Sequence, residues 1–475
     1  MKMEIGSLRG QCTCGREHEL AVKDIIIEKD ALKKLSGMLE SGILSQYTHP
    51  VIICDEHTLT AAEGQMEDVI AKLPVIELNP DNLHANNHGV AVAEAALARL
   101  EGTEDAAEDD GTAKIREPES ALSGEIDLLF ALGSGTIHDL TRYIAHKRGI
   151  DFVSLPTAAS VDGFVSTVAA MTWDGMKATL PAVAPIYVIA DTSVISRAPY
   201  RLTASGMADL FGKFTAIADW QIAHAVTGEY YCGRIADMEM DAINDVKDCM
   251  DDLRNGLPET SYRGLEMTRE EILEAAKSDI LPETEEAHAK LMYALLLSGL
   301  AMQMVGNSRP ASCAEHHMSH FWEMEVLNDH IDALHGEKVG VGLLLVTRRY
   351  KEIAEKLRAG KYHIEPWKGI EMDKIEASYG KKGLMEGTMK ENTPDPMAGI
   401  TPEQLEKNVP EIIRIIDTVL PSGEEIEELL KRGGCPSSME EIHLPESLAE
   451  DSLTLSPYVR NRLSFNRLRK MIVTE

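Results

Sequence analysis

The sequence is short of positive charge and of long hydrophobic runs. Lysine and arginine number 47 against 78 aspartates and glutamates, which gives a formal net charge of −31. Most of the surface would therefore repel a phosphate backbone, so we exclude nucleic acid as the main partner. No apolar stretch is long enough to cross a bilayer, and no early segment has the pattern of a secretion signal. We expect a soluble, cytoplasmic protein that does not insert into membranes.

Cysteine is also scarce, with seven residues scattered over 475 positions. An odd number spread over so long a chain does not predict a disulfide framework. Cys12 and Cys14, two positions apart, could act as thiolate ligands of a metal. No second cysteine pair completes such a site nearby in the sequence. We therefore interpret this pair as accidental or structural and leave its role open.

The length predicts two domains, and 44% hydrophobic residues are typical of a globular protein with a sizeable core. Short apolar runs alternate with helical patterns up to about residue 191, which predicts a mostly parallel sheet covered by helices. Helical patterns dominate after that point. We predict an α/β, Rossmann-like nucleotide-binding domain over residues 1–195 and an all-α domain with a C-terminal extension over residues 196–475. The expected strands are residues 24–28, 50–55, 75–78, 127–132, 152–156 and 186–191.

An acidic segment with few apolar residues, at 102–111, is interpreted as a solvated surface insertion. It interrupts the alternating pattern of the first domain. We assign no chemistry to it.

A glycine turn is the sharpest nucleotide-binding signal. The apolar strand at 127–132 runs into Gly133-Ser134-Gly135, and a helix containing Asp139 follows. In this order, backbone N–H groups at the start of the helix can approach a pyrophosphate, and glycine removes the side chain that would block it. The pattern is not the usual dinucleotide fingerprint, so a plain strand–helix turn is the alternative.

Two further strand ends carry polar residues. Asp55 ends the strand at 50–55, where it is placed either to meet a nucleotide ribose or to cap the next helix. The strand at 152–156 runs into small and hydroxylated residues at 157–166, which are suited to lining a cofactor groove.

The second domain contains a cluster of histidines. Five of the 16 histidines lie between His316 and His335, after an almost unbroken apolar run at 291–305 that predicts a buried helix. On a helix, His316 and His320 share one face. They are candidates for metal or substrate binding, and hydrogen-bonded core histidines are the alternative.

Asp209 and Lys213 stand four apart near the start of the helical region, where Ser205 is a plausible helix cap. They form either a solvated ion pair or, since their neighbours are small and apolar, a buried pair in which Asp209 has a metal or ligand partner. One carboxylate and two imidazoles, here Asp209, His316 and His335, are a frequent ligand set for a divalent metal with open positions. Beside a nicotinamide, such a metal can hold an alkoxide or polarise a ketone during hydride transfer.

Together these segments resemble one known family, the sn-glycerol-1-phosphate dehydrogenases. This family is a branch of the iron-type alcohol dehydrogenase, glycerol dehydrogenase and dehydroquinate synthase superfamily. The motifs that carry the resemblance are residues 133–139, 155–164, 205–213, 308–312, 315–320 and 334–337, and the early cysteine pair and residues 458–462 are similar to the longer bacterial members.

The resemblance implies a dehydroquinate synthase-like fold and a set of roles. Asp209, His316 and His335 would hold one divalent metal, zinc or nickel, and Asp162, Asp209 and His320 would contact the substrate. The residues implied for NAD(H) or NADP(H) are Asp55, Gly135, Thr136, Ile137, His138, Asp139, Thr157, Ala158, Ala159, Ser160 and Ser166.

The implied reaction is the reversible, NAD(P)-linked reduction of dihydroxyacetone phosphate to sn-glycerol 1-phosphate, a lipid precursor, by a homodimer. A polyol dehydrogenase of the same superfamily, a dehydroquinate synthase-like lyase and a non-catalytic nucleotide- and metal-binding protein are the alternatives. The substrate phosphate needs a local cation, and Lys213, Arg309 and Lys338 are candidates. Cys313 stands where the family has a small glycine, so its thiol could compete as a metal ligand.

Overall fold

The computed structural model describes residues 3–81, 83–102, 112–118, 124–324, 332–380 and 383–474. Residues 103–111 of the predicted acidic insertion lie outside this part of the chain, as does His330.

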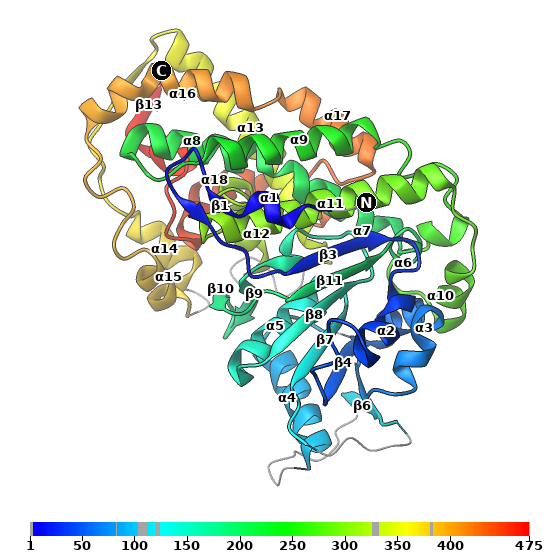
Figure 1. The fold of residues 1–475 in the computed structure, drawn as a ribbon. Coiled ribbons are helices and arrows are strands. Elements are labelled where there is room, and N and C mark those ends of the chain that lie inside the picture. Colours follow the sequence, from blue (N-terminus) through cyan, green and yellow to red (C-terminus); the bar gives the residue numbers. More distant parts are fainter. Residues whose placement is uncertain are drawn as a thin grey trace.

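A seven-stranded sheet forms the first part of the fold (Figure 1). The strands are β3 (Asp24–Glu28), β4 (Pro50–Asp55), β5 (Val75–Leu78), β6 (Ala113–Arg116), β7 (Leu128–Gly133), β8 (Asp151–Pro156) and β11 (Tyr187–Asp191). Their order is β3-β11-β8-β7-β4-β5-β6, and all neighbours are parallel except β5 and β6. The predicted α/β fold with a mostly parallel sheet is confirmed. The expected strands agree with the observed ones to within one residue at each end.

Apolar residues of the central strands alternate between two cores, one on each face of the sheet. Ile52 and Phe130 pack in one core, and their neighbours Val51 and Leu129 pack in the other. This alternation follows from the period of two of a strand, and burial on both faces explains why the central strands read as continuous apolar runs. The helices of this part are α2 (Leu35–Glu40), α3 (Glu56–Ile70), α4 (Asn87–Glu101), α5 (Gly135–Arg148) and α6 (Thr192–Ile195).

Three short antiparallel pairs were not expected from the sequence. They are β1 (Gly10–Gln11) with β2 (Glu17–His18), β9 (Val168–Trp173) with β10 (Met176–Pro181), and β12 (Tyr362–Ile364) with β13 (Ile472–Thr474). The β9–β10 turn has Asp174 and Gly175 in positive φ. Asp-Gly is a strong signal for a two-residue hairpin turn, so this pair could have been predicted.

Helices form the second part and lie beside the sheet (Figure 1). They are α7 (Tyr200–Phe211), α8 (Lys213–Thr227), α9 (Gly233–Asp248), α10 (Arg269–Ala276), α11 (Pro282–Val305), α12 (Ala314–Glu323), α13 (His335–Arg358), α14 (Met372–Ser378), α15 (Met385–Glu391), α16 (Pro402–Val419), α17 (Gly423–Gly433), α18 (Ala449–Leu455) and α19 (Phe465–Leu468). The predicted boundary at residue 195 falls between β11 and α7 and stays a prediction. The short first helix, α1 (Ile5–Leu8), lies against the helical part.

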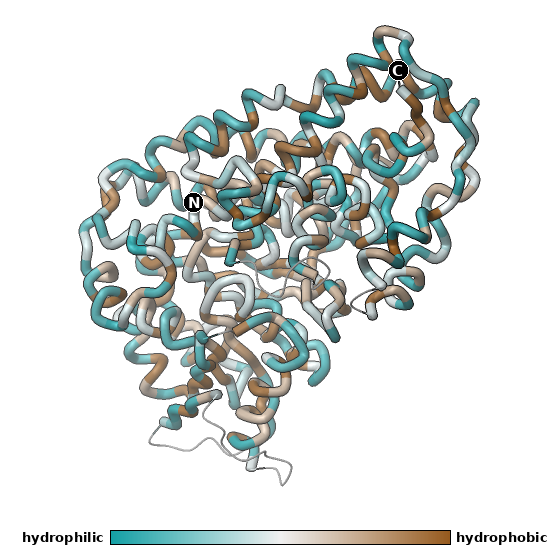
Figure 2. The backbone as a smooth tube through the Cα atoms, turned by 180° about the vertical axis from the view of Figure 1, so that it is seen from behind, coloured by the Kyte–Doolittle hydropathy of each residue, from teal (hydrophilic) through white to brown (hydrophobic). Residues whose placement is uncertain are grey.

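Apolar residues gather in the interior of both parts, and hydrophilic residues line the outer turns (Figure 2). In the described part of the chain, no helix is both long and apolar enough to cross a membrane.

The two parts meet where backbones approach closely. The expectation that Ser205 caps a helix is wrong, because α7 starts five residues earlier, after Pro199. The buried Ser205 hydroxyl instead accepts a bond from Gly336 N at 3.2 Å and donates to Ser160 O at 3.3 Å. A Cβ on Gly206 would lie 2.0 Å from Ala159 O, and one on Gly336 would lie 1.9 Å from Ser205 O. Glycine at these positions therefore allows α7, the start of α13 and the loop after β8 to touch.

Replacing Gly206 with alanine should lower the melting temperature, because the added methyl group would overlap the backbone of Ala159. Overpacking of this kind lowers the free energy of unfolding by about 1–3 kcal/mol. Gly64→Ala is the matched control, since Gly64 is also helical and a Cβ there meets nothing within 4 Å. The Gly64→Ala substitution should raise the free energy of unfolding by roughly 0.5–1 kcal/mol. Thermal unfolding followed by circular dichroism compares the two, and equal melting temperatures would contradict the expected overlap.

Candidate functional site

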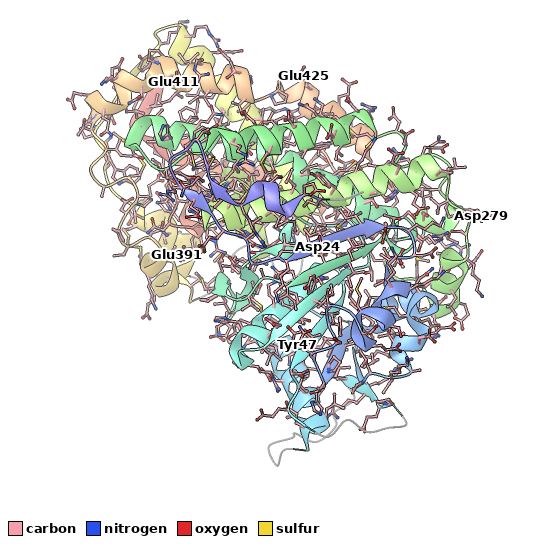
Figure 3. The ribbon with its side chains drawn as sticks, in the orientation of Figure 1. Asp24, Tyr47, Asp279, Glu391, Glu411 and Glu425 are labelled. Carbon is pink, nitrogen blue, oxygen red and sulfur yellow. The ribbon has the colours of Figure 1, made fainter. Side chains whose placement is uncertain are left out.

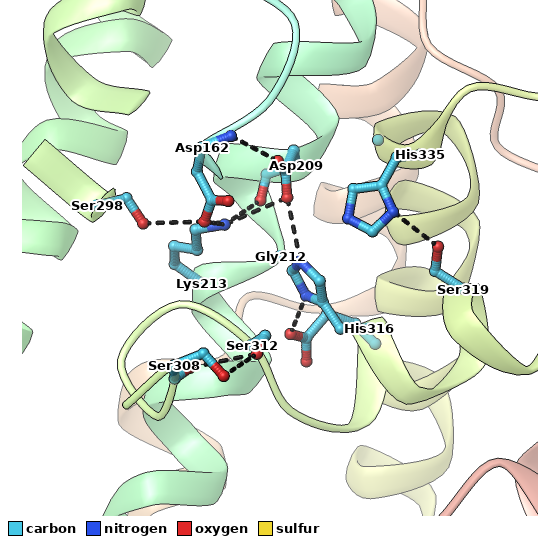
Figure 4. Close-up of polar contacts among 12 residues, drawn as sticks. Asp162, Asp209, Gly212, Lys213, Ser298, Ser308, Ser312, His316, Ser319 and His335 are labelled. Atoms are coloured by element: carbon cyan, nitrogen blue, oxygen red, sulfur yellow. Dashed lines mark hydrogen bonds and ion pairs between the residues drawn. The ribbon is translucent and has the colours of Figure 1, made fainter. Parts of the chain in front are cut away.

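Three potential metal ligands from three helices converge in the helical part (Figure 4). Asp209 comes from α7, His316 from α12 and His335 from the first position of α13. Their ligand atoms all lie within 4.8 Å of one another. The Asp209 Oδ1 to His316 Nε2 distance is 3.2 Å, and the rings of His316 and His335 are 5.2 Å apart between centroids. The structure thus brings together the three residues that the sequence nominated.

Both imidazoles are oriented by carboxylates. Glu315 Oε1 lies 2.7 Å from His316 Nδ1, and Glu323 Oε1 lies 2.9 Å from His335 Nδ1. Glu315 is itself held by the Thr215 hydroxyl at 2.6 Å. A carboxylate at Nδ1 directs Nε2 outward as a ligand, which is the usual environment of a metal-binding histidine. The residues present therefore fit a divalent metal better than they fit a set of ordinary core histidines.

The charges around Asp209 also suit a cation. Burial by itself would lower the pKa of His316, but hydrogen bonds with Asp209 and Glu315 raise it to about 9. Burial would raise the pKa of Asp209, yet Lys213 and His316 lower it, so Asp209 is ionised. The position between Asp209 and His316 thus favours positive charge, which a divalent metal can supply in place of the proton.

Lys213 is completely buried next to the ligand set (Figure 4). Its Nζ lies 2.7 Å from Asp162 Oδ2, 2.9 Å from Asp209 O and 3.3 Å from Asp209 Oδ1. Burial would lower the pKa of this ammonium, but the two aspartates raise it. All three ammonium hydrogens have acceptors, so Lys213 balances the aspartates and has no donor left for a substrate phosphate. The backbone N–H of Asp162 adds a bond to Asp209 Oδ2 at 2.9 Å.

His320 lies beside the other two histidines, with ring centroids 6.0 Å from His316 and 5.5 Å from His335. Its Nδ1 is 3.2 Å from Glu323 Oε2. Two lysines also reach this carboxylate, Lys177 at 3.1 Å and Lys338 at 3.3 Å. The Ser319 hydroxyl donates to Glu323 Oε1 at 3.2 Å as well. Together with His335, five cationic or donor groups therefore contact Glu323, which sequence reasoning missed.

On the sheet side, the glycine turn and the loop after β8 lie together. Thr157 N donates to Gly133 O at 3.0 Å, and the hydroxyls of Ser134 and Ser160 are 2.7 Å apart. Ser134 is the N-cap residue of α5, but its side chain makes no capping bond. Strand β7, the glycine turn and the start of α5 follow one another in the predicted order, beside buried Ala158 and Ala159. Phosphate binding at Gly135, Thr136 and Ile137 stays a prediction.

Other nominated cofactor residues have structural partners. His138 Nε2 bonds to the Ser154 hydroxyl at 2.7 Å, and burial lowers its pKa to about 3, so the ring is neutral and faces the sheet. Asp139 pairs with Arg142 at 3.6 Å. The Ser166 hydroxyl accepts from Val168 N at 3.1 Å. Their contacts with a cofactor stay predictions.

Asp55 caps α3 and forms a capping box with Thr58, whose N–H lies 2.9 Å from Asp55 Oδ1. The structure therefore shows the capping alternative. A ribose contact through the second carboxylate oxygen stays a prediction.

Two further expectations can be revised. Cys313 does not belong to the metal-ligand groups found among the described residues, and its Sγ lies 3.2 Å from Arg309 Nη1. Arg309 in turn forms a two-pronged ion pair with Glu229, at 2.7 and 2.6 Å, so its charge is already compensated. Cys313 is therefore not placed to compete as a metal ligand, and Arg309 is not placed to bind the substrate phosphate.

Comparisons with known proteins agree with this geometry. A family model described as iron-containing alcohol dehydrogenase matches residues 26–199, which include most of the sheet. The chain is 30% identical over 470 residues to glycerol-1-phosphate dehydrogenase (NAD(P)+) of Geobacillus stearothermophilus, covering 98% of this chain and 95% of the relative. The chain belongs to the glycerol-1-phosphate dehydrogenase family. A second member, from Bacillus velezensis, is 31% identical and matches 93% of this chain and 90% of its own.

Solved structures support the fold of this glycerol-1-phosphate dehydrogenase family member. A probable glycerol dehydrogenase from Sinorhizobium meliloti aligns with a TM-score of 0.52 at 14% identity, covering 94% of this chain and 91% of that one. The fold and the family resemblance inferred from the sequence are thus confirmed.

Removing the charge of Glu315 should weaken metal binding, because His316 would lose the carboxylate that fixes its orientation. Losing such an outer partner typically costs about 10–100-fold in metal affinity. The variant is Glu315→Gln, and competition with a chromophoric chelator measures the dissociation constant. Glu411→Gln removes a surface partner of Arg414 and serves as the control. Equal metal affinities for the two variants would show that Glu315 does not position His316.

Proposed function

We propose that this protein catalyses the reversible reduction of dihydroxyacetone phosphate to sn-glycerol 1-phosphate with NAD(P)H. The ketone carbon accepts a hydride from the dihydronicotinamide and its oxygen gains a proton, so the products are the secondary alcohol and NAD(P)+. The observation that carries the proposal is the convergence of Asp209, His316 and His335 next to the loop after β8. This loop bonds to Asp209 through Asp162 N and to the glycine turn through Ser160. The names of the full-length relatives support the same reaction.

In this proposal Asp209, His316 and His335 hold one divalent metal, either zinc or nickel. The metal, when bound, supplies positive charge that polarises the substrate oxygen. The protein's part is to fix these ligands. Lys213 keeps Asp209 ionised, and Glu315 and Glu323 hold both imidazoles with Nε2 pointing into the site.

The cofactor would bind along the start of α5 and residues 157–160, at the carboxyl ends of β7 and β8. This edge of a parallel sheet is where nucleotides bind in doubly wound folds. Asp162 and His320 would contact the substrate, since one adjoins Asp209 and the other adjoins His316. Assembly as a homodimer and a cytoplasmic location belong to the same proposal. The homodimer rests on the family resemblance alone, and the location is the expectation drawn from the sequence.

The phosphate of the substrate needs a local cationic site, because the chain as a whole has a net charge of −31. Figure 3 shows carboxylates such as Asp24, Asp279 and Glu425 on widely separated elements. Near the site, Arg460 Nη1 donates to Lys177 O at 3.2 Å, while its buried Nη2 has no hydrogen-bond partner among the residues that the structure describes. No ion pair to Arg460 occurs within 4 Å in the described residues. A buried guanidinium donor without an acceptor is costly, and a phosphate would satisfy it.

A second arginine from the same segment organises the neighbouring serines. Arg462 Nη2 donates to the Ser308 hydroxyl at 2.9 Å, and its Nη1 donates to the Ser312 hydroxyl at 3.1 Å. Burial lowers the pKa of Arg462 to about 10, so it stays charged at neutral pH. Within the described part of the chain, neither ring nitrogen of buried His317 has a hydrogen-bond partner. We therefore assign phosphate binding to Arg460, with Arg462 positioning Ser308 and Ser312.

The decisive assay uses the full-length protein, stripped with a chelator and reconstituted with zinc or nickel. NADH or NADPH oxidation is followed with dihydroxyacetone phosphate, and the stereochemistry of the product is determined. We expect metal-dependent turnover to sn-glycerol 1-phosphate, with dihydroxyacetone a poor substrate. Equal turnover of the unphosphorylated ketone would favour a polyol dehydrogenase, and no turnover of either would favour a lyase or a binding protein.

Arg460→Met should raise the KM for dihydroxyacetone phosphate, because a charged hydrogen bond worth about 1.5–3 kcal/mol is lost. This free energy corresponds to a rise of roughly 10- to 150-fold in that KM. The kcat/KM for dihydroxyacetone should stay the same, since it has no phosphate. Arg358→Met removes a surface partner of Asp417 and should change neither value. Parallel losses with both ketones would refute a phosphate-specific role.

A further inference from the structure

The cysteine pair near the N-terminus acquires two partners in the folded chain. Cys12, Cys14 and His18 lie on or beside the β1–β2 hairpin, while Cys232 is the residue just before α9. The hairpin crosses the helical part rather than the sheet (Figure 1). The ligand atoms of these four residues all lie within 4.8 Å of one another. A stretch of more than two hundred residues separates Cys232 from the other three in the sequence.

Three of the six distances between the ligand atoms are close to the edges of a tetrahedron around a metal, and the other three are within 4.8 Å. Cys12 Sγ lies 3.8 Å from Cys232 Sγ, Cys14 Sγ lies 3.5 Å from His18 Nε2, and Cys232 Sγ lies 3.9 Å from His18 Nε2. With zinc–sulfur bonds of about 2.3 Å and zinc–nitrogen bonds of about 2.0–2.1 Å, tetrahedral edges are roughly 3.8 Å between sulfurs and about 3.5 Å between sulfur and nitrogen. A disulfide would need sulfurs about 2.0 Å apart, and all seven cysteines are free.

The surroundings orient the ligands as a metal site requires. His18 is buried, and its Nδ1 lies 2.8 Å from the carbonyl oxygen of Met304. A ring nitrogen that donates to a carbonyl leaves the lone pair on the other nitrogen, here Nε2, directed at the three sulfurs. The Tyr230 hydroxyl lies 3.1 Å from Cys14 Sγ and can donate to a thiolate. The Arg16 guanidinium sits 3.5 Å above the Tyr230 ring and adds positive charge beside the cluster.

We propose that Cys12, Cys14, His18 and Cys232 bind one structural zinc ion. Three thiolates and one imidazole complete a tetrahedron and leave no open position, so this site holds the fold and takes no part in hydride transfer. Binding requires only that the three thiols lose their protons to solvent. The site is separate from Asp209, His316 and His335, and the proposal does not depend on the reaction that those residues perform.

The zinc would anchor the N-terminal segment to the end of α11. Besides the His18 contact with Met304, Ala21 N donates to the Gln303 side chain at 2.8 Å. The end of α11 leads directly into residues 308–312, whose hydroxyls Arg462 organises. Loss of the metal should therefore loosen the segment that precedes the proposed phosphate site.

Metal content and cobalt spectroscopy on the full-length protein test the proposal. Wild-type protein reconstituted with cobalt(II) should show the thiolate-to-cobalt charge-transfer absorption and the intense visible bands of a tetrahedral site. The Asp209 set has no thiolate and cannot produce the charge-transfer band. The double variant Cys12→Ser/Cys14→Ser should lose this band, contain one zinc fewer per chain and melt at a lower temperature.

Two further variants serve as controls. Cys249→Ser replaces a buried cysteine outside the cluster and should keep the band, and so should His316→Ala, which disrupts the other ligand set. Cys12 and Cys14 are partly exposed on a short hairpin, so the double variant is expected to fold. Absence of the charge-transfer band in the wild type, or an unchanged band and zinc content in the double variant, would overturn the proposal.

Discussion

The buried ion pairs of Lys213 with Asp162 and Asp209 are the interaction on which the candidate site depends. Two carboxylates this close together in the interior would not both be ionised without a cation between them. The ammonium, with no exposed surface, supplies that charge and uses all its hydrogens on the two aspartates. It thereby ties the loop after β8 to the junction of α7 and α8. Removing one partner would leave an uncompensated buried charge. The loss of folding stability would then be much larger than the net stabilisation that the pair provides.

Close backbone contact between the two parts complements this pairing. Gly206 and Gly336 have no side chain where Ala159 and Ser205 lie, so the loop after β8 can rest directly on α7 and α13. The same loop reaches the glycine turn through Ser160 and Ser134. One loop therefore contacts both the proposed nucleotide-binding edge and the proposed metal ligands. Local packing rather than a long linker fixes the distance between cofactor and metal.

The sequence allowed the central sheet to be predicted because β4, β7 and β8 are buried on both faces and appear as apolar runs. Prediction from the sequence failed where a side chain's role depends on partners that are distant in the chain. Ser205 resembled a cap, yet its hydroxyl bonds to Gly336 and Ser160. Glu315 adjoins His316 in sequence, but its role is visible only once the imidazole is placed beside Asp209. The partner of Cys12 and Cys14 is Cys232, and no local periodicity could bring them together.

Ligand chemistry distinguishes the two proposed metal sites. The set of Asp209, His316 and His335 offers one oxygen and two nitrogens, donors that zinc and nickel both accept, so availability and geometry would decide which metal occupies it. Three cysteines and a histidine are softer and fill a tetrahedron, the arrangement typical of structural zinc. With four protein ligands, a metal at Cys232 would exchange more slowly than one with open positions. The same chain can therefore retain zinc at the N-terminal hairpin, while the metal at Asp209, His316 and His335 depends on whether zinc or nickel is available.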